Sequence, residues 1–134
     1  MPTKPLILIV DDDEALRNAT KGLMRALGFR AEAFGAAEDL LKSDLLHSAA
    51  FIIADMQMPQ MSGLEMHRRL VGSGTSIPTI LITAYPDDSV RACALKAGIV
   101  CYLAKPFSQD EVLGYIRSAL DRSPAGPSPE ADVG

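Results

Sequence analysis

Four short apolar segments of this sequence each end on a polar side chain that phosphoryl chemistry could use. The first segment is followed by Asp11 and Asp12, and three later segments are followed by Asp55, Thr83 and Lys105. Together these residues offer three carboxylates, a hydroxyl and an ammonium group. Carboxylates bind divalent cations and can act as nucleophiles, while hydroxyl and ammonium groups bind phosphoryl oxygens. The five side chains can act together only if the fold brings the four segment ends to one place.

The three carboxylates would repel one another in a shared crevice. At a separation of about 4 Å and an effective dielectric constant of about 20, each pair of like charges costs about 4 kcal/mol. Mg²⁺ removes that cost, because it binds through a few carboxylates together with waters and phosphate oxygens. The alternative role for Asp11 and Asp12 is to complement the positive end of a following helix. We assign that role to Asp13 and Glu14 instead, because Asp55 stands at the end of a second strand.

Asp55 is the best candidate for a nucleophile. Aspartate side chains are ionised in neutral water, so an attack on phosphorus needs no general base and would yield an acyl phosphate. A backbone carbonyl in the irregular segment at residues 56–59 could complete the coordination of a metal ion. The alternative is that Asp55 only forms a turn at the end of its strand.

Lys105 and Thr83 are the candidates for binding phosphoryl oxygens. Lys105 precedes a proline, which keeps its backbone extended and fixes where the side chain emerges. Thr83 could donate a hydrogen bond from its hydroxyl, helped by the backbone N–H of Ala84. Taken alone, Lys105 is typical of a solvated surface lysine and Thr83 of a residue that ends a strand. Their spacing relative to the other segments favours the functional interpretation.

Strand-like and helix-like segments alternate along the chain, which predicts a parallel α/β sheet covered on both faces. The expected strands lie at residues 6–10, 30–34, 51–54, 79–82 and 100–104, and helices follow from about residues 14, 35, 62, 86 and 108. Gly28 is expected to end the first helix, and Ser62 and Ser108 to cap two later ones. In such a sheet the carboxyl ends of the strands form one edge, where ligands bind. The polar residues would therefore meet in one crevice.

The composition indicates one globular domain. The chain has 134 residues, is 48% hydrophobic and carries a formal net charge of -4, so no basic surface recommends nucleic acid as a direct partner. The amino-terminal apolar segment is too short for a signal peptide or a membrane span, which predicts a cytoplasmic protein without membrane attachment. Cys93 and Cys101 fit no metal or disulfide spacing and are expected to be reduced and partly buried. The folded domain is expected at residues 1–122, followed at residues 123–134 by a disordered Pro-rich tail or linker.

Five short motifs occur in order along the chain, and together they are far more specific than any one of them. They are Ile9-Val10-Asp11-Asp12, Asp55-Met56-Gln57-Met58-Pro59, Ser62-Gly63, Ile82-Thr83-Ala84 and Lys105-Pro106-Phe107. On these motifs the chain resembles the receiver domain of bacterial two-component response regulators, from about Pro5 to Arg122. It looks most similar to receivers that precede helix-turn-helix output domains.

The resemblance implies a flavodoxin-like fold, a doubly wound five-stranded parallel sheet in the order 2-1-3-4-5 with five flanking helices. It also implies that Asp55 accepts a phosphoryl group from a histidine kinase or a histidine phosphotransfer protein. Such a protein catalyses its own phosphoryl transfer and autodephosphorylation, but it is a regulator rather than a conventional enzyme.

Specific roles follow from the resemblance at matching positions. The implied Mg²⁺ ligands are Asp11, Asp12, Asp55 and the backbone carbonyl of Gln57. The implied phosphoryl contacts are Thr83, Ala84 and Lys105. Tyr102 matches an aromatic switch residue that rotates inward when the threonine moves onto the phosphoryl group. The fourth helix, the fifth strand and the fifth helix are the implied signalling face, which could also form a phosphorylation-dependent homodimer.

Three alternatives belong to other classes of protein. A Mg²⁺-dependent phosphatase of the haloacid-dehalogenase type also uses an aspartate nucleophile, but it places Asp-x-Asp after its first strand and adds a cap domain. A flavin-binding module of similar fold should offer hydroxyl and N–H donors in its first loop, where this chain has carboxylates from Asp11 to Glu14. A non-phosphorylated interaction domain would have no need of the intact set of polar residues.

Overall fold

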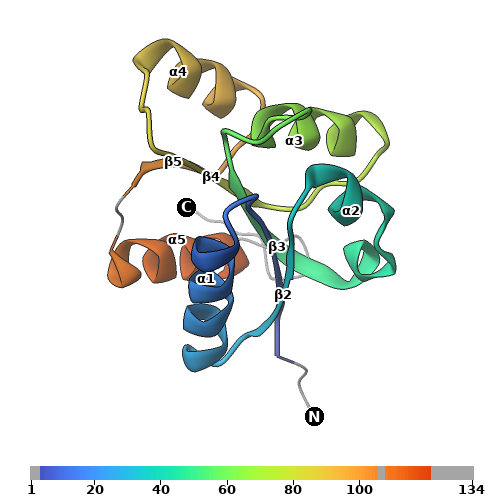
Figure 1. Ribbon diagram of the computed structural model, residues 1–134, viewed down its shortest axis with the longest axis vertical. Coiled ribbons are helices and arrows are strands. Elements are labelled where there is room, and N and C mark those ends of the chain that lie inside the picture. The colour runs from blue at the N-terminus through green and yellow to red at the C-terminus, as the bar shows by residue number, and fades with distance from the viewer. Residues whose placement is uncertain (1–3, 106–107, 122–134) are drawn as a thin grey trace.

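The computed structural model describes residues 4–105 and 108–121, which form alternating strands and helices (Figure 1). In chain order these are β1 (Leu6–Val10), α1 (Glu14–Ala26), β2 (Arg30–Phe34), α2 (Ala37–Lys42), the short 3-10 helix η1 (Asp44–Ser48), β3 (Ala49–Asp55), α3 (Gly63–Gly72), β4 (Thr79–Thr83), α4 (Asp88–Lys96), β5 (Cys101–Ala104) and α5 (Gln109–Asp121).

The five strands form one parallel sheet in the order β2-β1-β3-β4-β5, which confirms the predicted flavodoxin-like topology. Because the strands are parallel, their carboxyl ends lie along a single edge. The pairing also sets their relative heights: Asp55 at the end of β3 lies opposite Ile82, and Thr83 at the end of β4 lies opposite Ala104. The polar residues at these ends therefore emerge at nearly the same level.

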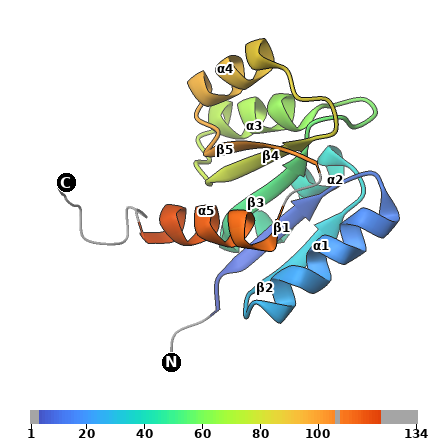
Figure 2. The same ribbon diagram turned by 90° about the vertical axis from the view of Figure 1, so that its left-hand side faces the viewer.

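An apolar layer covers each face of the sheet (Figure 2). Helices α1 and α5 lie on one face, and α2, α3 and α4 lie on the other. Successive side chains of a strand point to opposite faces, so Ile7 and Ile9 of β1 pack in the first layer, while Leu8 and Val10 pack in the second. All of these side chains are buried. The two layers fix the strands from both sides, and this fixes the sheet edge that carries the polar residues.

Two helix ends test the turn chemistry expected from the sequence. Gly28 follows α1 with a φ of 96°, a left-handed conformation that glycine adopts without strain, so the predicted stop is confirmed. The second helix is shorter than predicted and ends at Lys42. Ser43 has an extended backbone, and its hydroxyl accepts a hydrogen bond from the N–H of Leu45 at 3.0 Å. That bond begins the separate turn η1.

The predicted caps of two later helices are present. The hydroxyl of Ser62 accepts a hydrogen bond from the N–H of Glu65 at 3.1 Å and begins α3. At the start of α5, Ser108 and Glu111 exchange two bonds, since each side chain accepts from the backbone N–H of the other residue, at 3.0 and 3.1 Å. Both starts agree with the serine-to-glutamate spacing in the sequence.

The cysteine prediction is half right. Cys101 and Cys93 are both free thiols, but only Cys101 is buried, because Cys93 lies on the solvent side of α4. Within the described residues, no helix combines the length and the apolar character that crossing a membrane requires. The predicted tail at residues 123–134 lies outside the described residues.

Candidate functional site

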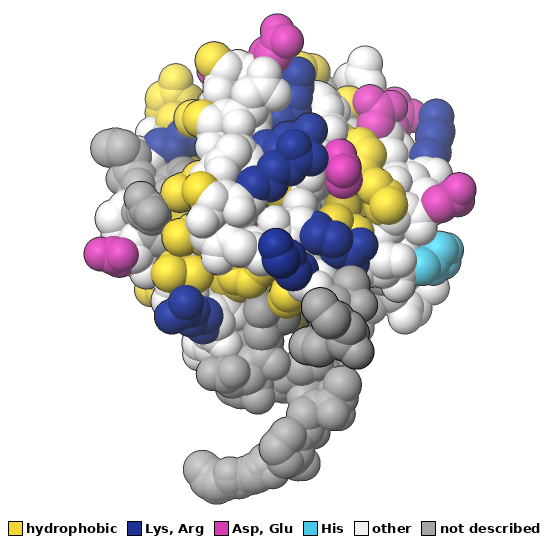
Figure 3. Space-filling model, turned by 90° about the horizontal axis from the view of Figure 1, so that it is seen from below, with side chains coloured by type: hydrophobic (Ala, Val, Ile, Leu, Met, Phe, Trp, Pro, Cys, Tyr) yellow, Lys and Arg dark blue, Asp and Glu magenta, His cyan; other side chains and the backbone are white. Residues whose placement is uncertain are grey.

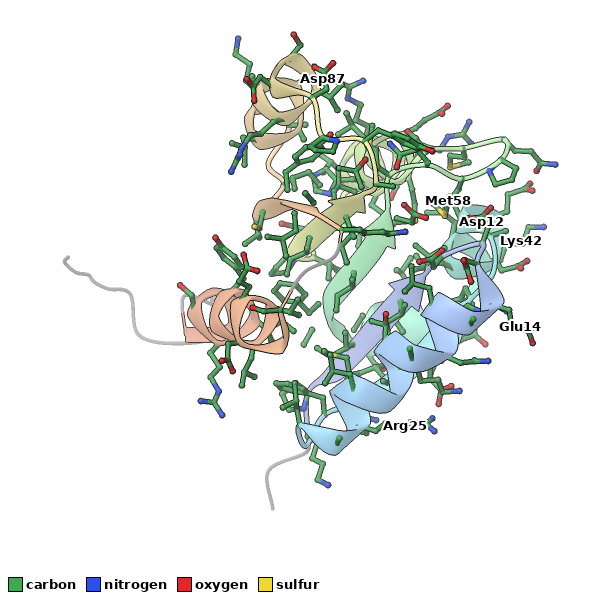
Figure 4. All side chains as sticks on the ribbon, turned by 60° about the vertical axis from the view of Figure 1, so that its left-hand side comes forward. Asp12, Glu14, Arg25, Lys42, Met58 and Asp87 are labelled. Carbon is green, nitrogen blue, oxygen red and sulfur yellow. The ribbon has the colours of Figure 1, made fainter. Side chains whose placement is uncertain are left out.

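Three carboxylates meet at the carboxyl edge of the sheet. Asp11 and Asp12 follow β1, and Asp55 ends the neighbouring strand β3. One ligand oxygen from each of the three lies within 4.8 Å of the others. Asp11 and Asp55 are buried, with exposed fractions of 7% and 6%, whereas Asp12 is exposed at the mouth of the site. Figure 4 labels Asp12 at this edge of the sheet.

Backbone hydrogen bonds hold Asp11 in place. Its N–H donates to the carbonyl of Phe34 at 3.1 Å, which extends the pairing of β1 with β2 by one residue. Its Oδ1 accepts from the N–H of Asp13 at 2.9 Å, and its carbonyl accepts from the Arg17 guanidinium at 2.9 Å. Asp13 caps α1 by accepting from the N–H of Leu16, so it has the helix-end role that the sequence predicts.

The Asp11 carboxyl has an unusual proton affinity. Burial raises its pKa from 3.8 to about 6, and the negative charge of Asp55 acts in the same direction. The hydrogen bond from the Asp13 N–H and the positive charge of Lys105 act against that increase. The raised pKa of Asp11 therefore reflects mainly the burial of the carboxyl, and the neighbouring charge of Asp55 adds to it.

Lys105 lies over the two buried carboxylates. Its Nζ is 3.4 Å from Oδ2 of Asp55 and 3.8 Å from Oδ2 of Asp11. The lysine is positioned by its backbone, because its N–H donates to the carbonyl of Thr83 at 2.8 Å and so extends the pairing of β5 with β4. The side chain stays 22% exposed. A cation at this position can reach both Asp55 and an anion bound beside it.

The fit of this site to a divalent cation can be judged from its charges. When ionised, Asp11, Asp12 and Asp55 carry three negative charges, and Lys105 supplies one positive charge. All the ligand atoms are carboxylate oxygens, which Mg²⁺ prefers over nitrogen or sulfur. The donor set and the excess of negative charge therefore both fit Mg²⁺.

The loop after β3 is tied to Asp55 and to β4. The N–H of Gln57 donates to Oδ1 of Asp55 at 3.2 Å, and the N–H of Met56 donates to the carbonyl of Ile82 at 2.7 Å. Gly63, the first residue of α3, packs directly under this turn. A Cβ atom at Gly63 would lie 2.6 Å from the carbonyl oxygen of Asp55, so only glycine lets α3 begin here.

Thr83 is fully buried, and its hydroxyl already has two partners. Its Oγ1 donates to Oε1 of the Gln57 side chain at 2.8 Å and accepts from the N–H of Tyr85 at 3.0 Å. Ala84 follows as an exposed residue. The hydrogen bond between the Gln57 side chain and Thr83 was not predicted from the sequence. The predicted strand order could have indicated this contact, because it places the loop after β3, with Gln57, next to the end of β4, with Thr83.

Tyr102 is buried with an exposed fraction of 5% and packs in the same apolar layer as Leu81 and Ala94. The tyrosine ring is therefore already in an inward position in this structure. Tyr102 and Thr83 belong to neighbouring strands and share the face of the sheet that α3 and α4 cover, as the alternation along β4 from Leu81 to Thr83 requires.

Comparison with known proteins identifies the class to which this fold and site belong. The family model described as "Response regulator receiver domain" matches residues 7–117. The chain belongs to this family. The phosphatase of the haloacid-dehalogenase type, the main alternative, is not favoured.

Individual relatives and structures agree with the family. The chain is 38% identical over 119 residues to the response regulator protein TmoT of Ectopseudomonas mendocina, covering 89% of this chain and 54% of TmoT. It is 39% identical over 119 residues to the response regulator protein TodT of Pseudomonas putida, covering 89% of this chain and 52% of TodT. The chain thus spans about half the length of these curated relatives.

Solved structures give the same result. The response regulator StyR superposes with a TM-score of 0.81 at 34% identity, covering 89% of this chain and 60% of StyR. The structure titled FixJ-N superposes with a TM-score of 0.80 at 29% identity, covering 91% of this chain and 98% of that one. The fold and the family are therefore those of a two-component receiver domain.

Proposed function

We propose that Asp55 accepts a phosphoryl group from a phosphohistidine of a histidine kinase or a histidine phosphotransfer protein. The observation that carries this proposal is the cluster of Asp11, Asp12 and Asp55 at one sheet edge with Lys105 over it. In the transfer, a carboxylate oxygen of Asp55 attacks phosphorus, and the bond between phosphorus and the donor imidazole nitrogen breaks. The products are an acyl phosphate on Asp55 and a free histidine on the partner.

The side chains around Asp55 have distinct tasks in this reaction. Lys105 already contacts Oδ2 of Asp55, and we propose that its ammonium moves onto a phosphoryl oxygen as negative charge builds up there. Thr83 supplies a hydroxyl donor and Ala84 a backbone N–H to the other phosphoryl oxygens. These donors are on neighbouring strand ends, so they converge on the group that Asp55 carries.

The same cluster is our proposed Mg²⁺ site, with Asp11, Asp12, Asp55 and the backbone carbonyl of Gln57 as ligands. A bound Mg²⁺ would neutralise charge on the phosphoryl oxygens and on the carboxylates. Asp11 must lose its proton before it can bind a cation, because metal ligands act in their deprotonated form. The exposed position of Asp12 at the mouth of the site leaves room for waters and for the incoming phosphoryl group.

The output of this site is a change of surface rather than a released product. We propose that the phosphoryl group draws the Thr83 hydroxyl toward itself and, together with Tyr102, changes the face formed by α4, β5 and α5. This change would favour a homodimer, and autodephosphorylation would end the signal. The chain on this account is regulatory and not a conventional enzyme. The cytoplasmic location and the identity of the kinase partner stay predictions.

The decisive experiment is phosphorylation by a small phosphodonor such as acetyl phosphate in the presence of Mg²⁺, followed by intact mass spectrometry. We expect the wild type to gain one phosphoryl group, Asp55→Asn to gain none, and Asp12→Ala to lose labelling together with its metal dependence. Asp39→Asn is the matched control, because Asp39 is an exposed aspartate on α2, and it should be labelled like the wild type. Labelling of Asp55→Asn, or sustained turnover of small phosphate esters by the wild type, would contradict the proposal.

A further inference from the structure

We infer that the side chain of Gln57 is a positioning residue that holds the Thr83 hydroxyl away from the phosphoryl site in the unphosphorylated protein. This inference rests on the proposed function of Asp55. It assigns to Gln57 a second role besides its backbone carbonyl, and that role depends on a contact between two side chains.

The hydrogen-bonding capacity of Thr83 is limited. A threonine hydroxyl has one hydrogen to donate. In this structure that hydrogen goes to Oε1 of Gln57 at 2.8 Å, and the oxygen accepts from the N–H of Tyr85 at 3.0 Å. Thr83 can therefore donate to a phosphoryl oxygen only after it releases Gln57.

Gln57 contacts both Asp55 and Thr83, the two residues that the phosphoryl group must connect. Its backbone N–H donates to Oδ1 of Asp55 at 3.2 Å, while its side chain binds Thr83. The backbone of the preceding residue is tied to β4, because the N–H of Met56 donates to the carbonyl of Ile82 at 2.7 Å. Gln57 is thus fixed beside the acceptor, and its amide can compete directly with a phosphoryl group on Asp55 for the single Thr83 hydrogen.

The other proposed switch residue, Tyr102, is already packed in the interior. Thr83 is fully buried and Tyr102 is already packed inside, with 5% of its surface exposed. Tyr102 therefore does not have to turn inward from this state. The bond from Thr83 to Gln57 is therefore the contact that has to break for the hydroxyl to engage the phosphoryl group.

The consequence is a competition that can be measured. Without the Gln57 amide, the buried Thr83 hydroxyl lacks its acceptor in the free protein but regains one when a phosphoryl analogue binds. The free state is then destabilised relative to the bound state. We expect the analogue to bind about two- to tenfold more tightly, the range that corresponds to one hydrogen bond.

The experiment measures the affinity of beryllofluoride, an analogue of the phosphoryl group, in the presence of Mg²⁺ by ¹⁹F NMR. The test variant is Gln57→Met, which keeps the length of the side chain and removes the amide acceptor. The matched control is Gln60→Met, since Gln60 is an exposed glutamine in the same loop. A third comparison introduces Gln57→Met into Thr83→Val, where no hydroxyl is left to compete for.

We expect tighter binding by Gln57→Met, unchanged binding by Gln60→Met, and no gain from Gln57→Met in the Thr83→Val background. Equal or weaker binding by Gln57→Met overturns the inference, as does a gain that persists without the Thr83 hydroxyl. Failure of the wild type to bind beryllofluoride at all would instead contradict the proposed function. The two failures are therefore distinguishable.

Discussion

Asp11 shows how burial changes the chemistry of one residue. Its carboxyl is 7% exposed and lies near the charge of Asp55, and these surroundings raise its pKa to about 6. The folded protein therefore binds the Asp11 proton more tightly than the unfolded chain does. The contribution of this group to stability is fully present below about pH 4 and is lost as pH rises through about 6.

Replacing Asp11 should therefore have an effect on stability that depends on pH. We compare the change in the free energy of unfolding that Asp11→Asn causes at pH 7 with the change that it causes at pH 4. In metal-free buffer, we expect the change at pH 7 to be the more stabilising of the two. The expected difference is about 1–2 kcal/mol, since a difference of one in pKa is worth about 1.4 kcal/mol and solvent at the open side of the site screens part of it. Asparagine can keep the hydrogen bond to the Asp13 N–H, so packing is little disturbed.

Urea unfolding at the two pH values measures this difference. Asp39→Asn on the exposed side of α2 is the control and should change stability equally at both. If the effect of Asp11→Asn is the same at pH 4 and pH 7, the raised pKa of Asp11 is wrong.

At the scale of elements, the site depends on how closely α3 approaches the end of β3. Gly63 begins α3, and its N–H lies 3.3 Å from the carbonyl of Met56. A Cβ atom there would lie 2.6 Å from the Asp55 carbonyl oxygen and 2.8 Å from Cδ2 of Leu81. The first contact is with backbone, which cannot rotate away. The helix and the acceptor residue are thus packed at the limit that atomic radii allow.

Gly63→Ala should separate these two elements. We expect the free energy of unfolding to fall by about 1–3 kcal/mol, because the added methyl group forces a backbone shift in a packed site. The matched control is Gly22→Ala in the middle of α1, where a Cβ atom would meet nothing within 4 Å. That substitution should instead stabilise the protein by about 0.5–1 kcal/mol, the helix preference of alanine over glycine. Equal stability of the two variants in urea unfolding would show that the close approach of α3 does not matter.

At the scale of the whole molecule, the two edges of the sheet differ in charge. The carboxyl edge carries the acidic site, while the opposite end gathers Lys and Arg side chains (Figure 3). A hollow of about 380 Å³ at that end includes Lys4, Arg25 and Arg30 in its wall. The two arginines already have partners, since Arg25 lies 3.7 Å from Glu32 and Arg30 donates to the carbonyl of Lys4. The acidic edge is therefore the better candidate for function.

The face formed by α4, β5 and α5 leads to a prediction about assembly. Leu95 on α4 and Tyr115 on α5 are large apolar side chains that are 46% and 40% exposed. We expect beryllofluoride and Mg²⁺ to raise the mass of the particle from the 14.3 kDa of one chain to that of a dimer, as measured by analytical ultracentrifugation. Leu95→Lys should prevent this change, because a charged side chain would be buried at the interface.

Val71→Lys is the matched control for that experiment, since Val71 is an apolar residue on α3 that is 52% exposed. It should dimerise like the wild type. A dimer that survives Leu95→Lys, or that Val71→Lys disrupts equally, would place the interface on another face.

The order of the elements could be predicted from the sequence alone, and so could the strand ends that carry Asp11, Asp55, Thr83 and Lys105. Apolar periodicity, helix caps and the stop at Gly28 are local signals, so they can be recognised without coordinates. The early end of α2 was not predicted; Ser43 leaves the helical conformation there, and its hydroxyl caps the separate 3-10 helix η1. The exposure of Cys93 was also missed, since α4 has too little apolar patterning to fix which side faces the sheet.

The distances within the site could not be predicted from the sequence. The separation of the three carboxylates, the raised pKa of Asp11, and the reach of Lys105 to two aspartates all arise between strands that are distant in sequence. The bond between Gln57 and Thr83 spans 26 residues and depends on the register of β3 against β4. Residue types set which interactions are chemically possible, but charge and hydrogen bonding act over a few ångströms, so packing decides which of them form.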